Sequence, residues 1–238
     1  MTDALSIRVV KDPNDPAIAG FGTMQTAAYF APETLIPARY IPQLLANPMR
    51  NFLVVAELEG RVVGGTLFHW LTDAGSAFSS FLGVERALRG QGIARRLHHH
   101  RFTILDRAAG GQAPGVFIDV VNPLRMPPDE FEREHKVGSD PFDRRRALAH
   151  LGFRQVDIRY EQPVGGPGGG PVTVLDLLYC PREPAESVTT ALVVATMHAY
   201  WTPWFGEREA TRHARELESR AQAGTRLSLI WPDSTGGD

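Results

Sequence analysis

The alternation of apolar and polar residues predicts three consecutive strands in the first half of the chain. The segment 52–58 is almost wholly apolar, as expected for a strand covered on both faces. Glu59-Gly60 can close a two-residue hairpin onto a returning strand over 62–71. A turn at 73–75 then leads into a third strand over 77–84. Strands joined by such short turns are expected to form an antiparallel meander.

Helices and further strands are expected around this meander. A helix over 92–109 places Ile93, Leu97 and Leu105 on one face, and a helix over 142–151 is closed by Gly152. Other helices are predicted over 16–30, 37–46, 185–201 and 207–223, and other strands over 7–10, 116–121, 153–161, 172–180 and 226–231. The connection 122–141 is expected to be irregular. The aromatic segment 201–205 is expected to pack onto the sheet, with a homodimer contact as the alternative.

Composition excludes several classes of protein. The chain has 238 residues, 43% of them hydrophobic, and a formal net charge of −2, which excludes a disordered chain and disfavours a nucleic-acid binder that acts through bulk charge. No apolar run approaches the roughly 18 residues that span a bilayer. Cys180 is the single cysteine, and the N-terminus lacks the features of a signal peptide. We therefore expect a cytoplasmic protein without membrane or nucleic-acid partners.

The segment 85–95 predicts an anion-binding turn between the third strand and the long helix. Gly90 and Gly92 allow a phosphate to approach the backbone, and the first amides of the helix lie at the positive end of its dipole. Arg89 and Arg95 add positive charge. A pyrophosphate suits such a turn, and a glycine-rich turn without a ligand is the simpler alternative. A dinucleotide-binding fold is disfavoured because Arg95 occupies the place of its third glycine.

Two motifs resemble those of the GNAT superfamily of N-acetyltransferases. Arg89-x-x-Gly92-x-Ala94 is similar to the Arg/Gln-x-x-Gly-x-Gly/Ala signature of that family, and Leu151-Gly152-Phe153 is similar to a junction typical of it. The resemblance covers about residues 5–180. It implies a mixed α/β (α+β) fold with a mostly antiparallel central sheet of about seven strands flanked by helices. We expect a GNAT-like domain over 1–180 and a C-terminal helical extension over 181–238.

The resemblance also implies a CoA thioester, usually acetyl-CoA, as cosubstrate. Its pyrophosphate would rest on the turn, and its pantetheine would add like a strand to the third meander strand where two parallel strands separate. The backbone amide of Val84 would polarise the thioester carbonyl. The implied cofactor-binding residues are Leu82, Gly83, Val84, Arg89, Gly90, Gln91, Gly92, Ile93, Ala94, Arg95 and Asn122.

Asp119 is the candidate general base. It lies in the apolar strand over 116–121, where burial would raise the pKa of its carboxyl group; an ion pair with an arginine is the alternative. The tyrosine that often serves as the acid in the family is replaced by Leu148. His150 is the first candidate to replace it, with His135, Tyr160 and water as others, although a histidine in the last turn of a helix also suits the helix dipole.

The remaining polar runs are expected to be structural. His98-His99-His100 lacks the spacing of a zinc site, so no metal is predicted, and His100 is expected to be the packed histidine of the three. Arg144-Arg145-Arg146 is expected to be an exposed helix face, with binding of an acidic group as the alternative. Phe131, Glu134 and His135 lie in a long insertion that could shape an acceptor pocket.

The sequence therefore predicts an acyltransferase that moves an acetyl group from acetyl-CoA to a primary amine by direct attack. The acceptor would be a small molecule or a peptide. A non-catalytic GNAT-like module that binds acyl-CoA is the first alternative, because the usual tyrosine is missing. A nucleotide-dependent oxidoreductase is the second.

Overall fold

The computed structural model describes residues 5–27, 35–47, 50–136, 138–164, 170–221 and 224–232. The last residues of the helix predicted over 16–30 lie outside this set. The chain forms two compact units. The first unit comprises residues 1–70, 79–112 and 127–140, and the second comprises residues 71–78, 113–126 and 141–238. The predicted division near residue 180 stays a prediction.

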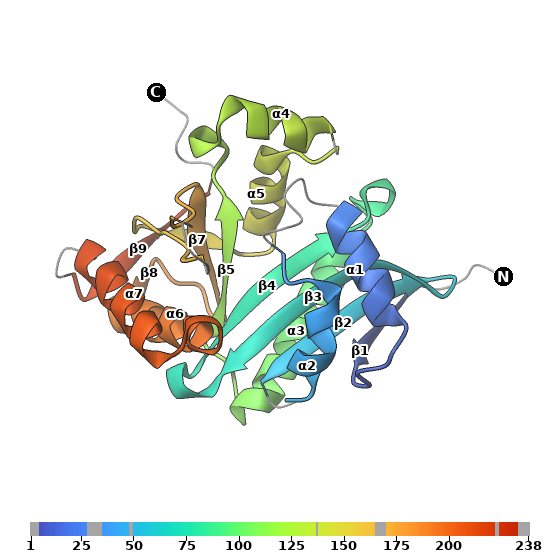
Figure 1. Cartoon of the computed structure of the whole chain (residues 1–238), viewed down its shortest axis with the longest axis horizontal. Coiled ribbons are helices and arrows are strands. Elements are labelled where there is room, and N and C mark those ends of the chain that lie inside the picture. The colour runs from blue at the N-terminus through green and yellow to red at the C-terminus, as the bar shows by residue number, and fades with distance from the viewer. Residues whose placement is uncertain are drawn as a thin grey trace. The chain divides into compact units, whose positions relative to one another are not determined.

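Among the described residues, nine strands form the sheet, rather than the expected seven, in the order β1-β2-β3-β4-β5-β7-β6-β9-β8 (Figure 1). They are β1 (Ser6–Val10), β2 (Asn51–Leu58), β3 (Arg61–Leu71), β4 (Ser76–Val84), β5 (Gly115–Val121), β6 (Arg154–Val156), β7 (Leu175–Pro181), β8 (Ser187–Thr189) and β9 (Arg226–Ile230). β4 and β5 pair in parallel, whereas β1–β2, β2–β3, β5–β7, β6–β7, β6–β9 and β8–β9 pair antiparallel. The expected mixed, mostly antiparallel fold is confirmed, and the C-terminal segment contributes β8 and β9 as well as helices.

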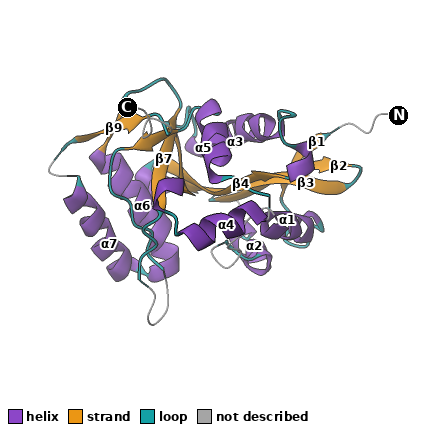
Figure 2. Ribbon diagram, turned by 90° about the horizontal axis from the view of Figure 1, so that it is seen from above, coloured by secondary structure: helices purple, strands orange, loops and turns teal. Residues whose placement is uncertain are grey.

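Helices cover both faces of the sheet in the first unit. α1 (Ala17–Ala27) and α2 (Ile41–Leu45) lie on one face of β1–β4, and α3 (Ile93–Ala109) lies on the other (Figure 2). Phe21, Ile41, Leu53 and Leu67 belong to the core between the sheet and the first two helices.

The hairpin between β2 and β3 turns through Glu59 and Gly60, both with positive φ, as predicted. The connection expected to be irregular contains a helix, α4 (Pro128–Lys136), whose first turn is acidic and last turn basic.

The second unit has its own core, formed by strands and by the C-terminal helices. α5 (Pro141–His150), α6 (Thr190–Phe205) and α7 (Glu207–Arg220) belong to this unit. Phe117, Tyr160 and Trp201 are buried in its core. The expected packing of the aromatic segment therefore holds for Trp201 and is wrong for Trp204, which is 43% exposed. Of the strand predicted over 153–161, only β6 forms. The Ile158 N–H donates to the Val156 carbonyl, and this local bond interrupts the pairing with the next strand.

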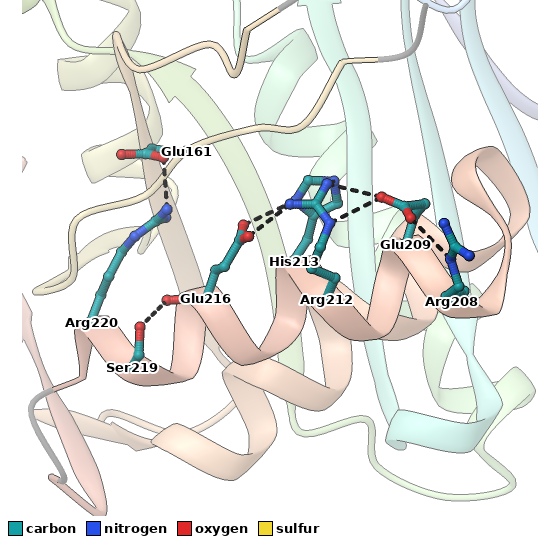
Figure 3. A network of polar contacts seen from close by, with 8 residues as sticks. All are labelled: Glu161, Arg208, Glu209, Arg212, His213, Glu216, Ser219 and Arg220. Carbon is teal, nitrogen blue, oxygen red and sulfur yellow. Dashed lines mark hydrogen bonds and ion pairs between the residues drawn. The ribbon is translucent and has the colours of Figure 1, made fainter.

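α7 carries a ladder of charged side chains on one face (Figure 3). The Arg212 guanidinium pairs with Glu209 and Glu216, at spacings of three and four residues. At the end of the helix, Arg220 reaches Glu161 at 2.7 Å. Surface pairs of this kind contribute little stability each, so the buried face of α7 accounts for its position. Within the described residues, no helix is long and apolar enough to cross a membrane.

Candidate functional site

The predicted anion-binding turn is formed by two glycines in the left-handed region. Gly90 has φ 79° and Gly92 has φ 76°, and an added Cβ at either position would meet no atom within 4 Å. Glycine is therefore required here by the left-handed backbone conformation, because the surroundings would leave room for a Cβ atom. α3 begins directly after Gly92, and the Arg96 N–H makes a 3.1 Å bond to the Gly92 carbonyl. The amides of residues 93–95 precede this bond, so they have no acceptor within the helix and are available to an anion.

The end of β4 presents backbone amides on the edge opposite β3. The Glu85 N–H donates to the Val63 carbonyl of β3 at 2.8 Å. Because successive peptide groups of a strand alternate between its two edges, the amides of Val84 and Leu82 point away from β3. The Val84 carbonyl on this edge accepts a bond from Arg89 Nε at 3.3 Å. This bond connects the turn to β4. The N–H groups of Leu82 and Val84 stay directed away from β3.

The parallel ladder between β4 and β5 is short. It consists of the pairs Ala77↔Val116 and Phe78↔Phe117, although β4 continues to Val84 and β5 to Val121. The predicted separation of the two strands stays a prediction. The edge of β4 that carries the Leu82 and Val84 amides lies beyond the last of these pairs.

Asp119 lies on β5 in the second unit, with Tyr160 beside it. The Tyr160 hydroxyl lies 3.3 Å from Asp119 Oδ2. Burial raises the pKa of the Asp119 carboxyl group to about 6, and the hydrogen bond from Tyr160 opposes part of this rise. A carboxyl group with this pKa is mostly ionised at neutral pH and can still accept a proton, which suits a general base.

Aromatic and amide groups hold Tyr160 in place. Its hydroxyl also contacts Gln162 Oε1, and Trp201 Nε1 donates to the same oxygen at 3.2 Å. The rings of Tyr160 and Trp201 stack with centroids 6.5 Å apart. Burial and the Asp119 carboxylate raise the pKa of Tyr160 well above its usual range, so the phenol keeps its proton. Sequence reasoning named Tyr160 only as one possible acid and missed Gln162 and Trp201.

Asn122, Arg125 and Arg145 take part in a buried polar cluster around Asp176. Asn122 accepts from the Leu124 N–H at 3.0 Å and donates to Asp176 Oδ2 at 2.9 Å. Arg145, which is buried, pairs with the same carboxylate at 2.7 Å. The expectation that 144–146 form an exposed face is therefore wrong for Arg145. The predicted contact of Asn122 with a cofactor stays a prediction.

The histidines take mainly structural positions. His150 is exposed, and its Nδ1 lies 2.7 Å from the Arg146 carbonyl, as expected for a histidine in the last turn of a helix. The packed residue of the histidine run is His98, which is buried against Arg101, rather than His100. The described residues contain no cluster of His, Cys, Asp and Glu side chains that could hold a metal ion.

The structural comparisons find the same fold in solved structures that are described as acetyltransferases. A GNAT-family protein from Bacteroides thetaiotaomicron superposes with a TM-score of 0.57 at 11% identity, over 84% of this chain and 98% of the other. An aminoglycoside 6'-N-acetyltransferase complexed with coenzyme A gives 0.53 at 16% identity, over 76% and 98%. A probable acetyltransferase from Staphylococcus epidermidis gives 0.53 at 10% identity, over 76% and 100%. At these identities the likeness shows the fold alone.

The sequence comparisons match one family model to part of the chain. A search of curated proteins gives no match. The family model described as "Acetyltransferase (GNAT) family" matches residues 8–123, a range that includes the whole of β4, the glycine turn, α3 and β5. Residues 8–123 of this chain are therefore an acetyltransferase domain of the GNAT family.

Proposed function

We propose that this protein transfers an acetyl group from acetyl-CoA to a primary amine of a small molecule or peptide. The observation that carries the proposal is the turn at Gly90 and Gly92, which opens the amides at the start of α3 toward an anion. A pyrophosphate fits this turn because its charge complements the helix dipole and the exposed Arg89 and Arg95. Coenzyme A carries such a group, and the aminoglycoside acetyltransferase of the same fold is a complex with coenzyme A.

The Val84 and Leu82 amides are proposed to hold the rest of the cosubstrate. An extended arm that leaves the turn can add to the free edge of β4 as another strand. The Val84 amide keeps the role that the resemblance implies for it, which is to polarise the thioester carbonyl and stabilise its developing negative charge. The Leu82 amide is proposed to bind the pantetheine arm.

Asp119 is the proposed general base. The amine nitrogen attacks the thioester carbonyl carbon, the carbon–sulfur bond breaks, and the sulfur leaves as a thiolate. Asp119 accepts the proton that the nitrogen loses, and its raised pKa supports this role. His150 stays the sequence-based candidate for the acid that protonates the thiolate. The family match supports a transferase over the oxidoreductase alternative.

The test is release of free thiol from acetyl-CoA in the presence of a panel of primary amines that includes polyamines, aminoglycosides and peptides. We expect thiol release that depends on the amine and an acetylated product detectable by mass spectrometry. Asp119→Asn is the matched control, because it keeps the shape of the side chain and removes the base. Binding of coenzyme A without thiol release for every amine would favour the non-catalytic module. Binding of a nicotinamide dinucleotide in place of coenzyme A would favour the oxidoreductase.

A further inference from the structure

The hydrogen bonds around Asp119 continue past Tyr160 to Gln162 and Trp201 of the second unit. The Tyr160 hydroxyl lies between Asp119 Oδ2, at 3.3 Å, and Gln162 Oε1. Trp201 Nε1 donates to the same Gln162 oxygen at 3.2 Å. Tyr160 is fully buried and Trp201 is 1% exposed. The four side chains therefore form one hydrogen-bonded chain that begins at the proposed base and ends in the core at Trp201.

The donors of this chain fix the orientation of the Gln162 amide. An indole N–H can only donate, so the amide atom that faces Trp201 is the oxygen. Gln162 Nε2 donates to the Pro163 carbonyl at 3.2 Å. The backbone of Gln162 is held as well, because its N–H and its carbonyl pair with Val172 at 3.0 and 2.9 Å. Gln162 therefore presents an acceptor, and not a donor, to Tyr160.

The single hydrogen of the Tyr160 hydroxyl consequently has two acceptors. A phenol carries one O–H, and the raised pKa of Tyr160 keeps it there. The hydrogen can point to the Asp119 carboxylate or to Gln162 Oε1, and it cannot serve both fully. The separation from Asp119 exceeds the usual length of an O–H···O bond, about 2.5–3.0 Å. The share of the hydrogen that Gln162 takes is lost to ionised Asp119.

Proton uptake by Asp119 removes this competition. A neutral carboxyl group is a weaker acceptor than a carboxylate, so the Tyr160 hydrogen turns to Gln162 once Asp119 is protonated. An acceptor at Gln162 thus favours the protonated form of Asp119 over the ionised form. In the proposed transfer, an N–H bond of the amine breaks and the O–H bond of Asp119 forms. Tyr160 keeps its own hydrogen throughout and changes only its acceptor.

The other titratable groups around this chain act on Tyr160 or have partners of their own. Tyr179 of β7 lies on the same face of the sheet as Asp119, and its hydroxyl donates to the Pro114 carbonyl at 2.8 Å. Asp176 of β7 is paired with Val120 and lies on the opposite face. Burial, Asp119 and Tyr200 of α6 raise the pKa of Tyr160. The remaining neighbours are paired: His213 of α7 with Glu216, and Glu161 with both Arg159 and Arg220.

We propose that Gln162, held in place by Trp201, is a positioning residue for the general base: it receives the Tyr160 hydrogen bond when Asp119 takes up the proton of the amine. The inference rests on the proposed function, because that function assigns the proton to Asp119. Gln162 acts through Tyr160 alone. With this acceptor in place, Asp119 is a stronger base than an aspartate to which the Tyr160 hydrogen is wholly committed.

Gln162→Met tests the inference, because it removes the acceptor and keeps the length of the side chain. The Tyr160 hydrogen is then left to Asp119, so the acidic limb of kcat/KM, expected near pH 6 in the wild type, should move down by about one pH unit. Carbon-13 NMR of the Asp119 carboxyl group in the free protein should give the same shift. Gln25→Met is the matched control. Gln25 is buried in α1 and donates to the Ile36 carbonyl at 2.8 Å, so this variant also loses a hydrogen bond but should keep the wild-type midpoint.

A double substitution shows whether Gln162 acts through Tyr160. Tyr160→Phe has no hydrogen to share, so adding Gln162→Met to it should leave the Asp119 midpoint unchanged. A downward shift of equal size with and without the Tyr160 hydroxyl would overturn the inference. If Gln162→Met fails to fold, Gln162→Asn draws the acceptor back by one methylene group and should shift the midpoint in the same direction.

The outcomes separate the inference from the proposed function. An active wild type whose Asp119 midpoint is unchanged or raised in Gln162→Met overturns the role of Gln162 alone, as does an equal shift in Gln25→Met. A shift in the NMR titration without one in the rate profile overturns both the role of Gln162 and the assignment of Asp119 as the base. A wild type that releases no thiol with any amine removes the proposed function, and the inference with it.

Discussion

Replacing Gly92 with alanine tests whether the turn before α3 holds the pyrophosphate. The residue has φ 76°, and an added Cβ would meet no atom within 4 Å. The substitution therefore introduces backbone strain without a collision. A residue other than glycine in the left-handed region lowers the stability of the fold by about 1–2 kcal/mol. The variant turn either keeps its conformation at this cost or adopts another conformation.

Gly110 provides a matched control at the other end of the same helix. It is the C-cap of α3, has φ 67°, and also has no atom within 4 Å of an added Cβ. Gly110→Ala should therefore lower the free energy of unfolding by the same 1–2 kcal/mol as Gly92→Ala. Urea denaturation of both variants measures this cost, and equal values make the two proteins comparable in every respect except the turn.

The two variants are expected to differ in their affinity for coenzyme A. A hydrogen bond to a charged group contributes about 1.5–3 kcal/mol, so a shift of the turn that loses one bond to phosphate raises the Kd ten- to a hundredfold. Isothermal titration calorimetry should show this loss for Gly92→Ala and wild-type affinity for Gly110→Ala. Wild-type affinity in both variants, or the same loss in both, would refute the assignment of the turn.

Three substitutions and one control, Arg146→Met, test the second unit. Asp119→Asn should lower kcat by about 10²–10⁴-fold. It should also abolish the fall in kcat/KM that the wild type should show as the pH drops through about 6. Because the pKa of Asp119 is higher in the folded than in the unfolded protein, ionisation of this carboxyl group destabilises the wild type as the pH rises, so urea denaturation should show the variant gaining stability relative to wild type from pH 4 to pH 8. Tyr160→Phe removes the bond that lowers the Asp119 pKa, so the acidic limb of the rate profile should move to higher pH. Arg145→Met removes one of the two arginines that pair with the buried Asp176, and Arg125 stays as the other. The variant should lose about 1.5–3 kcal/mol of stability in urea, the contribution of a hydrogen bond to a charged group. Arg146→Met, at an exposed position, should change stability by less than about 0.5 kcal/mol.

The glycine turn could be predicted from sequence because its chemistry is local. The apolar pattern of the helix starts within a few residues of Gly90 and Gly92. The order of these features predicts where the helix begins. The same holds for the hairpin at Glu59-Gly60, whose two residues both adopt positive φ. In both places the backbone conformation depends on neighbours in the chain, so reading the sequence is sufficient.

The sheet was harder to predict where strands are short or pair over long distances. β8 has three residues, too few for an alternating pattern, and it pairs with β9 almost forty positions later in the chain. β6 ends after Val156 because of one local hydrogen bond at Ile158, although the alternation of the sequence continues to Glu161. Neither feature leaves a signal in hydrophobic periodicity.

The partners of the candidate residues also depend on tertiary contacts. Asp119 was identified by its apolar strand, but Tyr160 is separated from it by 41 residues, and only the fold brings the two together. Gln162 and Trp201 left no signal, because a glutamine beside a proline and a tryptophan in an apolar helix have many structural roles. Their hydrogen bond joins residues 39 positions apart, and it too depends on the fold.

Comparing coenzyme A with free pantetheine by calorimetry tests the central claim most directly. Pantetheine contains the arm that would add to β4 and lacks the pyrophosphate. If the amides at the start of α3 hold that group, coenzyme A should bind at least a hundredfold more tightly than pantetheine, since a diphosphate makes several charge-assisted bonds. Equal affinity for the two ligands, or no binding of coenzyme A at all, would contradict the account.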